Sequence, residues 1–365
     1  GDGEVPKILG DADLSMEGDM WVLDIPPSES VRRVKLIYSD AEGFDDSLRS
    51  LSLSLEGDRP LRWPETIETA IEPCGTSGPY VHERVLPPFE NPWKSLMFLG
   101  GLDTLADGRP VVSTLFGDVW VVSNIDEGTP TWKRFATGLN QPMGIRIVDG
   151  RMLVLERGQL TELIDHDQDG EADEYRNINN RWHTTGDPHC FDINLEIDPQ
   201  GNYYFIKNGS WHTPTGGCLL RIAADGSGDA EIYATGFRHC NSLGISPSGQ
   251  LASGGQQGTW QPATRLDLNH EGGFYGLMEA AHREVEFYDR PLIWMPLEAD
   301  NSAGDPVWAP EGWGPLGGSL LHLSWGQCWL MLILEEEVEG VRQGAAVVLP
   351  LGRFMAGPSR GRFCQ

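Results

Sequence analysis

Residues 235 to 260 read Thr235-Gly-Phe-Arg-His-Cys-Asn-Ser-Leu-Gly-Ile-Ser-Pro-Ser-Gly-Gln-Leu-Ala-Ser-Gly-Gly-Gln-Gln-Gly-Thr-Trp260. The stretch begins with a polar loop that carries Arg238, His239 and Asn241, and it continues into a short apolar strand. A Ser-Pro-Ser-Gly turn at residues 246–249 separates this strand from a second one, which ends in a glycine-rich segment. Pro and Gly between two apolar runs are typical of an antiparallel hairpin.

The same kind of turn recurs along the chain at a nearly constant spacing. Gly108, Gly150, Gly201 and Gly249 each close a short polar turn ahead of an apolar run, and they are 42, 51 and 48 residues apart. Ala-Thr-Gly occurs at residues 136–138 and 234–236, in each case ahead of a Gly-Ile pair. A period of roughly 40 to 50 residues is the mark of a repeat architecture.

Each repeat contains several short β-branched or aromatic segments separated by Gly, Pro, Asp and Asn. Units of about four strands match the blades of a β-propeller, which stack radially and bury faces that no single blade could bury. We therefore predict an all-β protein with a β-propeller from about residue 97 onward. A β-sandwich is the alternative.

The regions outside the repeats differ in composition. Residues 1–56 alternate apolar and polar side chains, as in residues 20–25 and 34–38, and predict a small β-rich N-terminal extension or a fragment of a preceding domain. Residues 57–96 are rich in Pro and Gly and predict an ordered linker. Residues 97–365 form the predicted propeller, and because the period calls for a further strand after Gln365, we expect it to be truncated at its C-terminus.

The composition excludes several classes of function. The chain has 365 residues, 27 basic and 54 acidic side chains and a formal charge of −27, which argues against nucleic acid or an anionic membrane as a partner. It contains no run of about 18 apolar residues that could span a bilayer. It starts with Gly and has no signal peptide, so we expect a mature or excised piece. Its six cysteines form no zinc or haem motif, which leaves disulfides and solitary thiols both open.

An acidic segment has the spacing of a calcium-binding loop. Carboxylates occur at Asp165, Asp167, Asp169, Glu171 and Asp173, with a glycine after the third. A tight loop with acids at these positions gathers oxygens around Ca²⁺. The twelfth position holds Arg176, so the bidentate acid of a complete EF-hand is absent. We predict a structural calcium loop between strands, with a solvated acidic turn as the alternative.

Polar residues precede the first strand of successive repeats. His189 occupies the position before its strand that Arg238 and Asn241 hold in the next unit. A propeller directs such loops toward its axis, so we expect His189, Arg238 and Gln141 to converge. A lone histidine is more often a surface or core residue, but the pairing with an arginine at the equivalent place favours a functional site.

Taken together, these motifs resemble the glucose/sorbosone dehydrogenase family of six-bladed soluble quinoprotein propellers. The likeness extends to planctomycete-type membrane-bound dehydrogenases and sorbosone dehydrogenase homologues, in which a haem-binding cytochrome c segment follows the propeller. It covers about residues 57–365 and depends on the motifs Asn91-Pro-Trp93, Gly117-Asp-Val-Trp120, Asp167-Gln-Asp-Gly-Glu-Ala-Asp173, Gly236-Phe-Arg238 with Asn241, Gly258-Thr-Trp260, Gly272-Gly-Phe-Tyr-Gly276 and Trp313-Gly-Pro315.

The resemblance implies roles for several residues. His189 matches the histidine that removes the sugar hydroxyl proton while hydride passes to pyrroloquinoline quinone (PQQ). Arg238 matches an arginine near the quinone, although His239 and Cys240 intervene before Asn241 and the family's proline is lost. Backbone oxygens of Gly258 and Thr259 match the ligands of a calcium ion that polarises the quinone. The acids that relatives carry ahead of that turn are absent here. Gln141 and Asn241 are implied cofactor contacts.

The expected function is therefore a quinoprotein-like dehydrogenase that oxidises a sugar, alcohol or aldehyde in the periplasm or outside the cell. The resemblance implies that electrons pass to a cytochrome c domain or protein whose haem c lies beyond this chain. A non-catalytic propeller that binds carbohydrate or a protein partner is one alternative. A gluconolactonase-like hydrolase is another, in which Glu, Asn and Asp hold a water-activating calcium; Asn241 and Asp300 could serve, but no convincing Glu is present.

Overall fold

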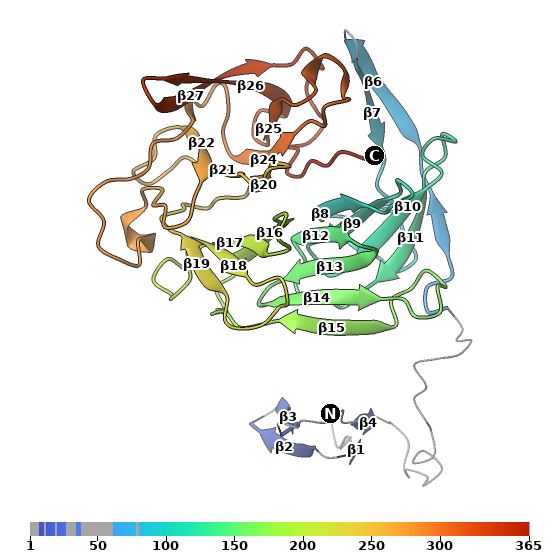
Figure 1. Ribbon diagram of the computed structural model, residues 1–365. Coiled ribbons are helices and arrows are strands. Elements are labelled where there is room, and N and C mark those ends of the chain that lie inside the picture. Colours follow the sequence, from blue (N-terminus) through green and yellow to red (C-terminus); the bar gives the residue numbers. More distant parts are fainter. Residues whose placement is uncertain are drawn as a thin grey trace. The chain divides into compact units, whose positions relative to one another are not determined.

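The computed structural model describes residues 7–10, 12–18, 20–26, 34–37, 61–77 and 80–364 (Figure 1). Contacts divide the chain into two compact units, Gly1–Gly57 and Asp58–Gln365. The predicted boundary between residues 56 and 57 lies outside the described residues, as does residue 365. The first unit contains two antiparallel pairs: β1 (Lys7–Leu9) with β4 (Lys35–Ile37), and β2 (Asp13–Glu17) with β3 (Met20–Asp24).

The second unit contains, within its described residues, five antiparallel sheets of four or five strands, which we number as blades 1 to 5, and a two-stranded hairpin. Blade 1 consists of β8 (Leu99–Thr104), β9 (Pro110–Thr114), β10 (Val119–Ser123) and β11 (Thr131–Ala136), with β5 (Thr66–Glu68) added at its outer edge. Blade 2 consists of β12 (Gly144–Val148), β13 (Arg151–Glu156), β14 (Gln159–Ile164) and β15 (Glu174–Asn179), and blade 3 of β16 (Phe191–Ile197), β17 (Tyr203–Asn208), β18 (Cys218–Ile222) and β19 (Glu231–Ala234). Blade 4 consists of β20 (Gly244–Ile245), β21 (Leu251–Gly255), β22 (Thr264–Asn269) and β23 (Ile293–Met295), and blade 5 of β24 (Ala303–Trp308), β25 (Leu320–Ser324), β26 (Trp329–Val338) and β27 (Val341–Val348).

The predicted all-β propeller is confirmed. The first strands of the blades contact one another in succession, from β8 through β12, β16 and β20 to β24, and lie nearest the centre in Figure 1. The helices of the described residues are the short 3₁₀ turns Met278–Ala280 and Gly314–Leu316. Within that part of the chain, none has the length and apolar character needed to cross a membrane.

Glycines allow the innermost strands to approach closely. A Cβ atom on Gly144 would lie 2.6 Å from the backbone of Asn194 in the next blade, and one on Gly244 would collide with the carbonyl oxygen of Pro306. Only glycine permits such contact between two backbones. The repeated Gly-Ile pairs therefore mark the places where successive blades meet at the axis.

Each interface between blades has its own apolar core. Because every blade buries both faces, its middle strands are apolar rather than alternating. Burial of one such side chain contributes about 1.5 to 3 kcal/mol to the free energy of unfolding. Representative pairs, from the interface of blades 1 and 2 to that of blades 4 and 5, are Val121 and Val154, Leu155 and Leu220, Ile206 and Leu251, and Leu266 and Ile333.

Residues ahead of blade 1 cover the face of this blade that is turned away from blade 2. Trp93 packs on the fully buried Trp120, with ring centroids 5.6 Å apart. The hairpin of β6 (Ile71–Ser77) and β7 (Tyr80–Val85) reaches the side of blade 5, where Tyr80 stacks on Trp313 with centroids 4.6 Å apart. This segment thus bridges blades 1 and 5 (Figure 1).

A network of charged side chains fills the centre of the propeller. Register shifts in β16 and β24 occur next to Glu196 and Asp305, which are both essentially buried. Arg146 of β12 pairs with Glu196 at 3.1 Å, and Arg362 of the C-terminal segment pairs with Glu196 at 2.7 Å and with Asp305 at 3.5 Å. Burial raises the pKa of Glu196, and the Arg362 and Arg146 charges oppose that rise. The C-terminal segment is therefore anchored on the axis by ion pairs.

Candidate functional site

A cavity of about 490 Å³ opens at one end of the propeller. This volume is in the range typical of sites for small ligands. Loops and strand ends of blades 2 to 5 supply its walls, which consist of Met143, His189, Phe191, Ile193, Asn208, Arg238, His239, Asn241, Gly254, Gln256, Gln257, Ser302, Ala303 and Trp325.

Strand direction explains why residues so far apart in sequence share this cavity. The strands of a blade run antiparallel, so the loop before its first strand and the turn after its second strand lie at the same end. His189 precedes β16, and Asn208 ends β17 of the same blade. Arg238 precedes β20, and Gln257 follows β21. The cavity is therefore built from these two kinds of connection.

The structure brings together three of the residues predicted from the sequence. His189, Arg238 and Asn241 line the cavity. Gln141 is not among the lining residues, and its side-chain oxygen accepts a hydrogen bond from Arg157 at 3.2 Å. Gly258 and Thr259 are also absent from the lining, and both of their carbonyl oxygens accept hydrogen bonds from the backbone NH of Gln261.

Arg238 presents an uncompensated guanidinium to the cavity. Its Nη1 donates to the carbonyl oxygen of Gln257 at 2.7 Å, while its buried Nε has no partner in the described part of the chain. Among the described residues, no carboxylate forms an ion pair with it. Burial lowers its pKa, but an arginine stays charged in proteins. A Cβ atom on Gly258 would collide with this guanidinium, so glycine is needed there for the side chain to lie flat against the turn.

The cavity is free of acidic side chains. None of its lining residues is Asp or Glu, although the chain carries 54 acids and a formal charge of −27. Its polar groups are instead amides, a hydroxyl, two imidazoles and one guanidinium. Arg238 is half-buried, and a partly buried cation without a counter-ion is costly, so this arrangement favours an anionic ligand.

The floor and one wall of the cavity are held by hydrogen bonds between distant segments. Arg360 of the C-terminal segment donates to the carbonyl oxygen of Asn241 at 2.9 Å. Gln256 donates to the hydroxyl of Ser302 at 2.9 Å, and the side-chain oxygen of Gln257 accepts from the backbone NH of Ser302 at 3.1 Å. These bonds join blade 4 to blade 5 at the cavity.

Sequence reasoning missed part of the lining. Asn208 ends the second strand of its blade, and Gln256, Gln257 and Trp325 follow second strands, whereas the prediction considered only the loops that precede first strands. The repeat pattern carries the signal that could have identified them, because both connections lie at the same end of a blade. His239 belongs to the polar loop of residues 238–241, but the sequence predicted no role for it.

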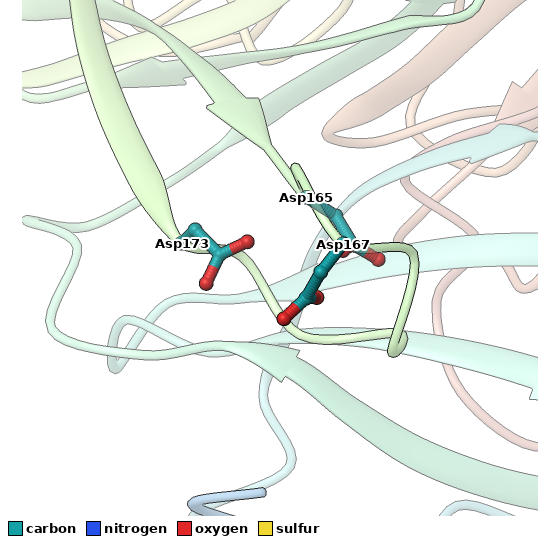
Figure 2. A group of neighbouring side chains, drawn as sticks. All are labelled: Asp165, Asp167 and Asp173. Atoms are coloured by element: carbon teal, nitrogen blue, oxygen red, sulfur yellow. The ribbon is translucent and has the colours of Figure 1, made fainter. Parts of the chain in front are cut away.

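The acidic loop between β14 and β15 brings three carboxylates together (Figure 2). Oxygen atoms of Asp165, Asp167 and Asp173 lie within 4.8 Å of one another. The chain turns sharply at Gly170, whose φ is +85°, and the backbone NH of Gly170 donates to Asp165 at 2.9 Å. Burial raises the pKa of Asp165, and the nearby charge of Asp169 adds to the rise. A bound cation would relieve this repulsion.

The other two predicted ligands have different partners. The two carboxylate oxygens of Glu171 accept hydrogen bonds from the backbone NH groups of Arg62 and Trp63, at 2.9 and 2.8 Å. The Asp169 carboxylate accepts from the backbone NH of Glu171 at 2.8 Å. Glu171 thus ties residues 62 and 63 to blade 2, while Asp169 shapes the loop.

The two residues considered for a hydrolytic calcium site have different surroundings. Asn241 lines the cavity, whereas Asp300 is fully buried and bonds to His322 at 2.8 Å and to Ser324 at 2.5 Å. Because the lining residues include no carboxylate, a calcium ion in the cavity would have neutral oxygen ligands alone.

No family model and no curated protein sequence matches the chain. Solved structures do resemble it. A glucose dehydrogenase-type oxidoreductase of Thermus thermophilus superimposes with a TM-score of 0.55 at 16% identity, over 70% of this chain and 85% of that one. The apo form of the soluble aldose sugar dehydrogenase of Escherichia coli gives 0.55 at 10% identity, over 80% and 90%. The PQQ-bound form of an aldose sugar dehydrogenase of Streptomyces coelicolor gives 0.51 at 13% identity, over 77% and 85%. At these identities the likeness establishes a shared propeller fold.

Proposed function

We propose that the protein is a PQQ-dependent-type dehydrogenase that oxidises a sugar, or a simple alcohol or aldehyde. The observation that carries this proposal is the acid-free cavity with its unpaired arginine, Arg238. PQQ is a planar tricarboxylate, and such a ligand suits a site with one free guanidinium and several amide donors. The propeller fold shared with sugar dehydrogenases supports the same reading.

The residues of the cavity fit this chemistry. When bound, the quinone supplies an oxidant that accepts a hydride from the substrate carbon. Arg238 would bind a carboxylate or a developing negative charge, and its contact with the Gln257 carbonyl fixes its direction. One of two imidazoles, His189 or His239, would take the hydroxyl proton. The indole of Trp325 is 47% exposed at the cavity wall and offers a flat apolar face to a sugar ring.

The proposal includes no calcium ion beside the cofactor. The carbonyl oxygens of Gly258 and Thr259 are engaged by Gln261, and the lining residues include no carboxylate. Carboxylates are among the usual ligands of calcium, and the lining side chains offer only neutral amide and hydroxyl oxygens.

A dye-linked assay tests the function. The protein supplied with PQQ is expected to reduce an artificial electron acceptor in the presence of an aldose, an alcohol or an aldehyde. The double variant His189→Ala/His239→Ala is expected to lose at least about 100-fold in kcat, because general base catalysis contributes 10²- to 10⁴-fold. The matched control His270→Ala alters an exposed histidine outside the cavity and should keep the rate. Quinone-independent sugar binding without turnover would instead indicate a non-catalytic propeller.

We further propose that the loop of Asp165, Asp167 and Asp173 binds one Ca²⁺ in a structural role. Its three carboxylates within 4.8 Å support this. A ligand that binds only the folded state raises its stability by mass action. Addition of calcium is therefore expected to raise the Tm, and removal by a chelator should lower it.

Asp167→Asn is the variant that tests this loop, because Asp167 is exposed and its replacement removes one charge without creating a cavity. The calcium-dependent rise in Tm should disappear, whereas the exposed Asp126→Asn should retain it. Scanning calorimetry with and without calcium gives the answer. An equal response in both variants would mean that the loop is a solvated acidic turn.

We also propose an electron acceptor of the cytochrome c type, in the periplasm or outside the cell. The formal charge of −27 supports association with a positively charged redox protein, because complementary charge accelerates encounter. Reduction of a basic cytochrome by the sugar-supplied protein, weakening as salt is added, would support this acceptor; a rate independent of salt would count against it.

A further inference from the structure

The loop between β19 and β20 places an additional imidazole, His239, on the cavity wall beside Arg238. The family pattern has no counterpart for it, since the motif around Arg238 departs from that pattern at this residue. His239 is half-buried, whereas His189 is exposed. The two rings lie 6.1 Å apart between centroids, so both can reach one ligand.

A hydrogen bond to Asn208 selects the tautomer of His239. Its Nδ1 lies 2.9 Å from Oδ1 of Asn208. An amide oxygen can only accept, so Nδ1 carries the proton and Nε2 keeps its lone pair. His239 therefore has one nitrogen committed to the protein and one available as a base.

Packing holds the ring in place. The indole of Trp211 lies against it, with centroids 4.9 Å apart at an interplanar angle of 62°. The backbone of His239 has a φ of +39°, in the left-handed region that residues with a side chain rarely adopt. The next residue, Cys240, is fully buried. His189, in contrast, is tethered through its backbone NH, which donates to Asp187 at 2.9 Å. His239 is thus the better oriented of the two imidazoles.

The charges around His239 favour its neutral form. Burial lowers its pKa, the adjacent Arg238 lowers it further, and His189 adds a smaller effect in the same direction. Asp187, in the loop before β16, opposes them. Asn208 and Trp211, which face the ring from the end of blade 3's second strand, are uncharged. Together these effects favour the unprotonated imidazole, which can accept a proton.

We propose that Nε2 of His239 is the base that takes the hydroxyl proton of the substrate, and that His189 contacts the substrate at the mouth of the cavity. This inference depends on the proposed dehydrogenase function. The O–H bond gives its proton to Nε2, and the adjacent C–H bond breaks with its electron pair, which leaves as hydride to a quinone oxidant. The C–O bond becomes C=O, so atoms and electrons balance.

The first arm of the test needs no turnover. Nitrogen-15 NMR of the histidine side chains in the cofactor-free protein is expected to show the Nδ1–H tautomer for His239 and a pKa below the ordinary value of about 6.5. Asn208→Asp places a carboxylate of the same shape against Nδ1 and should raise that pKa by about one pH unit or more. An Nε2–H tautomer, or a pKa of His239 that does not change in Asn208→Asp, would overturn the assignment.

The second arm is the pH dependence of kcat/KM. Activity should be lost as pH falls through the pKa that NMR gives for His239, because protonation removes the base. Asn208→Asp should shift this acidic limb of the pH profile to higher pH. His239→Gln should lower kcat by about 10²- to 10⁴-fold while the protein still binds PQQ. If the acidic limb of the pH profile keeps its position in Asn208→Asp but shifts in His189→Asn, His189 rather than His239 is the base. Absence of turnover in the unaltered protein would refute the dehydrogenase function itself, even where the NMR result holds.

Discussion

Arg238→Ala is expected to lower the affinity of the protein for PQQ by about 10- to 100-fold. Within the residues that the structure describes, the guanidinium has one hydrogen bond, to the Gln257 carbonyl, its Nε has no partner, and no acid lines the cavity. A charge-assisted hydrogen bond to a carboxylate is worth about 1.5 to 3 kcal/mol, which corresponds to this change in Kd. Titration of the quinone into the protein, followed by calorimetry, measures it.

Two further substitutions sharpen this prediction. Gly258→Ala keeps the charge but pushes a methyl group into the guanidinium, so it should weaken binding as well. Arg109→Ala removes an exposed arginine that pairs with Asp107 and should leave the Kd unchanged. Equal affinity of Arg238→Ala and the unaltered protein would show that the anion site lies elsewhere.

Arg362→Ala is expected to reduce the free energy of unfolding of the second unit by about 3 to 5 kcal/mol, the usual cost of removing one partner from a buried ion pair. Glu196 and Asp305 are 1% and 0% exposed, and Arg362 pairs with both. Without it, Glu196 keeps its ion pair with Arg146, and burial favours the protonated form of Glu196. Denaturant titration followed by tryptophan fluorescence measures the loss.

The exposed pair of Arg342 and Glu335 provides the matched control. Arg342→Ala breaks this surface ion pair and should change stability by less than about 1 kcal/mol. Adding Glu196→Gln to Arg362→Ala removes the uncompensated acid and should restore part of the loss. Similar effects of Arg362→Ala and Arg342→Ala would mean that water reaches the central network.

The propeller could be predicted because its determinants are local and repeated. Turns such as those ending at Gly150 and Gly201 join the first two strands of a blade, and the Gly-Ile pairs at residues 144 and 244 mark close contacts at the axis. The segment ahead of blade 1 could only be described as a linker. Its contacts, such as Tyr80 on Trp313, join residues more than 200 positions apart and leave no pattern in the sequence.

In the candidate site, too, local features could be predicted from the sequence, whereas contacts between distant segments could not. His189 and Arg238 were identified because each precedes the first strand of its repeat, and they line one cavity. Glu171 has the spacing of a calcium ligand, yet Arg62 and Trp63 engage both of its oxygens from about 110 residues away. The hydrogen bond between Asn208 and His239 likewise joins two blades. The spacing of a motif shows which hydrogen-bonding atoms a segment carries, but not which distant residue binds them.

Single-turnover reduction tests the central claim most directly. The protein loaded with PQQ is mixed anaerobically with excess aldose, alcohol or aldehyde, and the absorbance of the quinone is followed without any electron acceptor. We expect one member of this panel to reduce the quinone in stoichiometric amount with the protein, and we expect Arg238→Ala to fail to do so at the same quinone concentration. A quinone that binds in the cavity but stays oxidised with every substrate, or that does not bind at all, would contradict the dehydrogenase proposal.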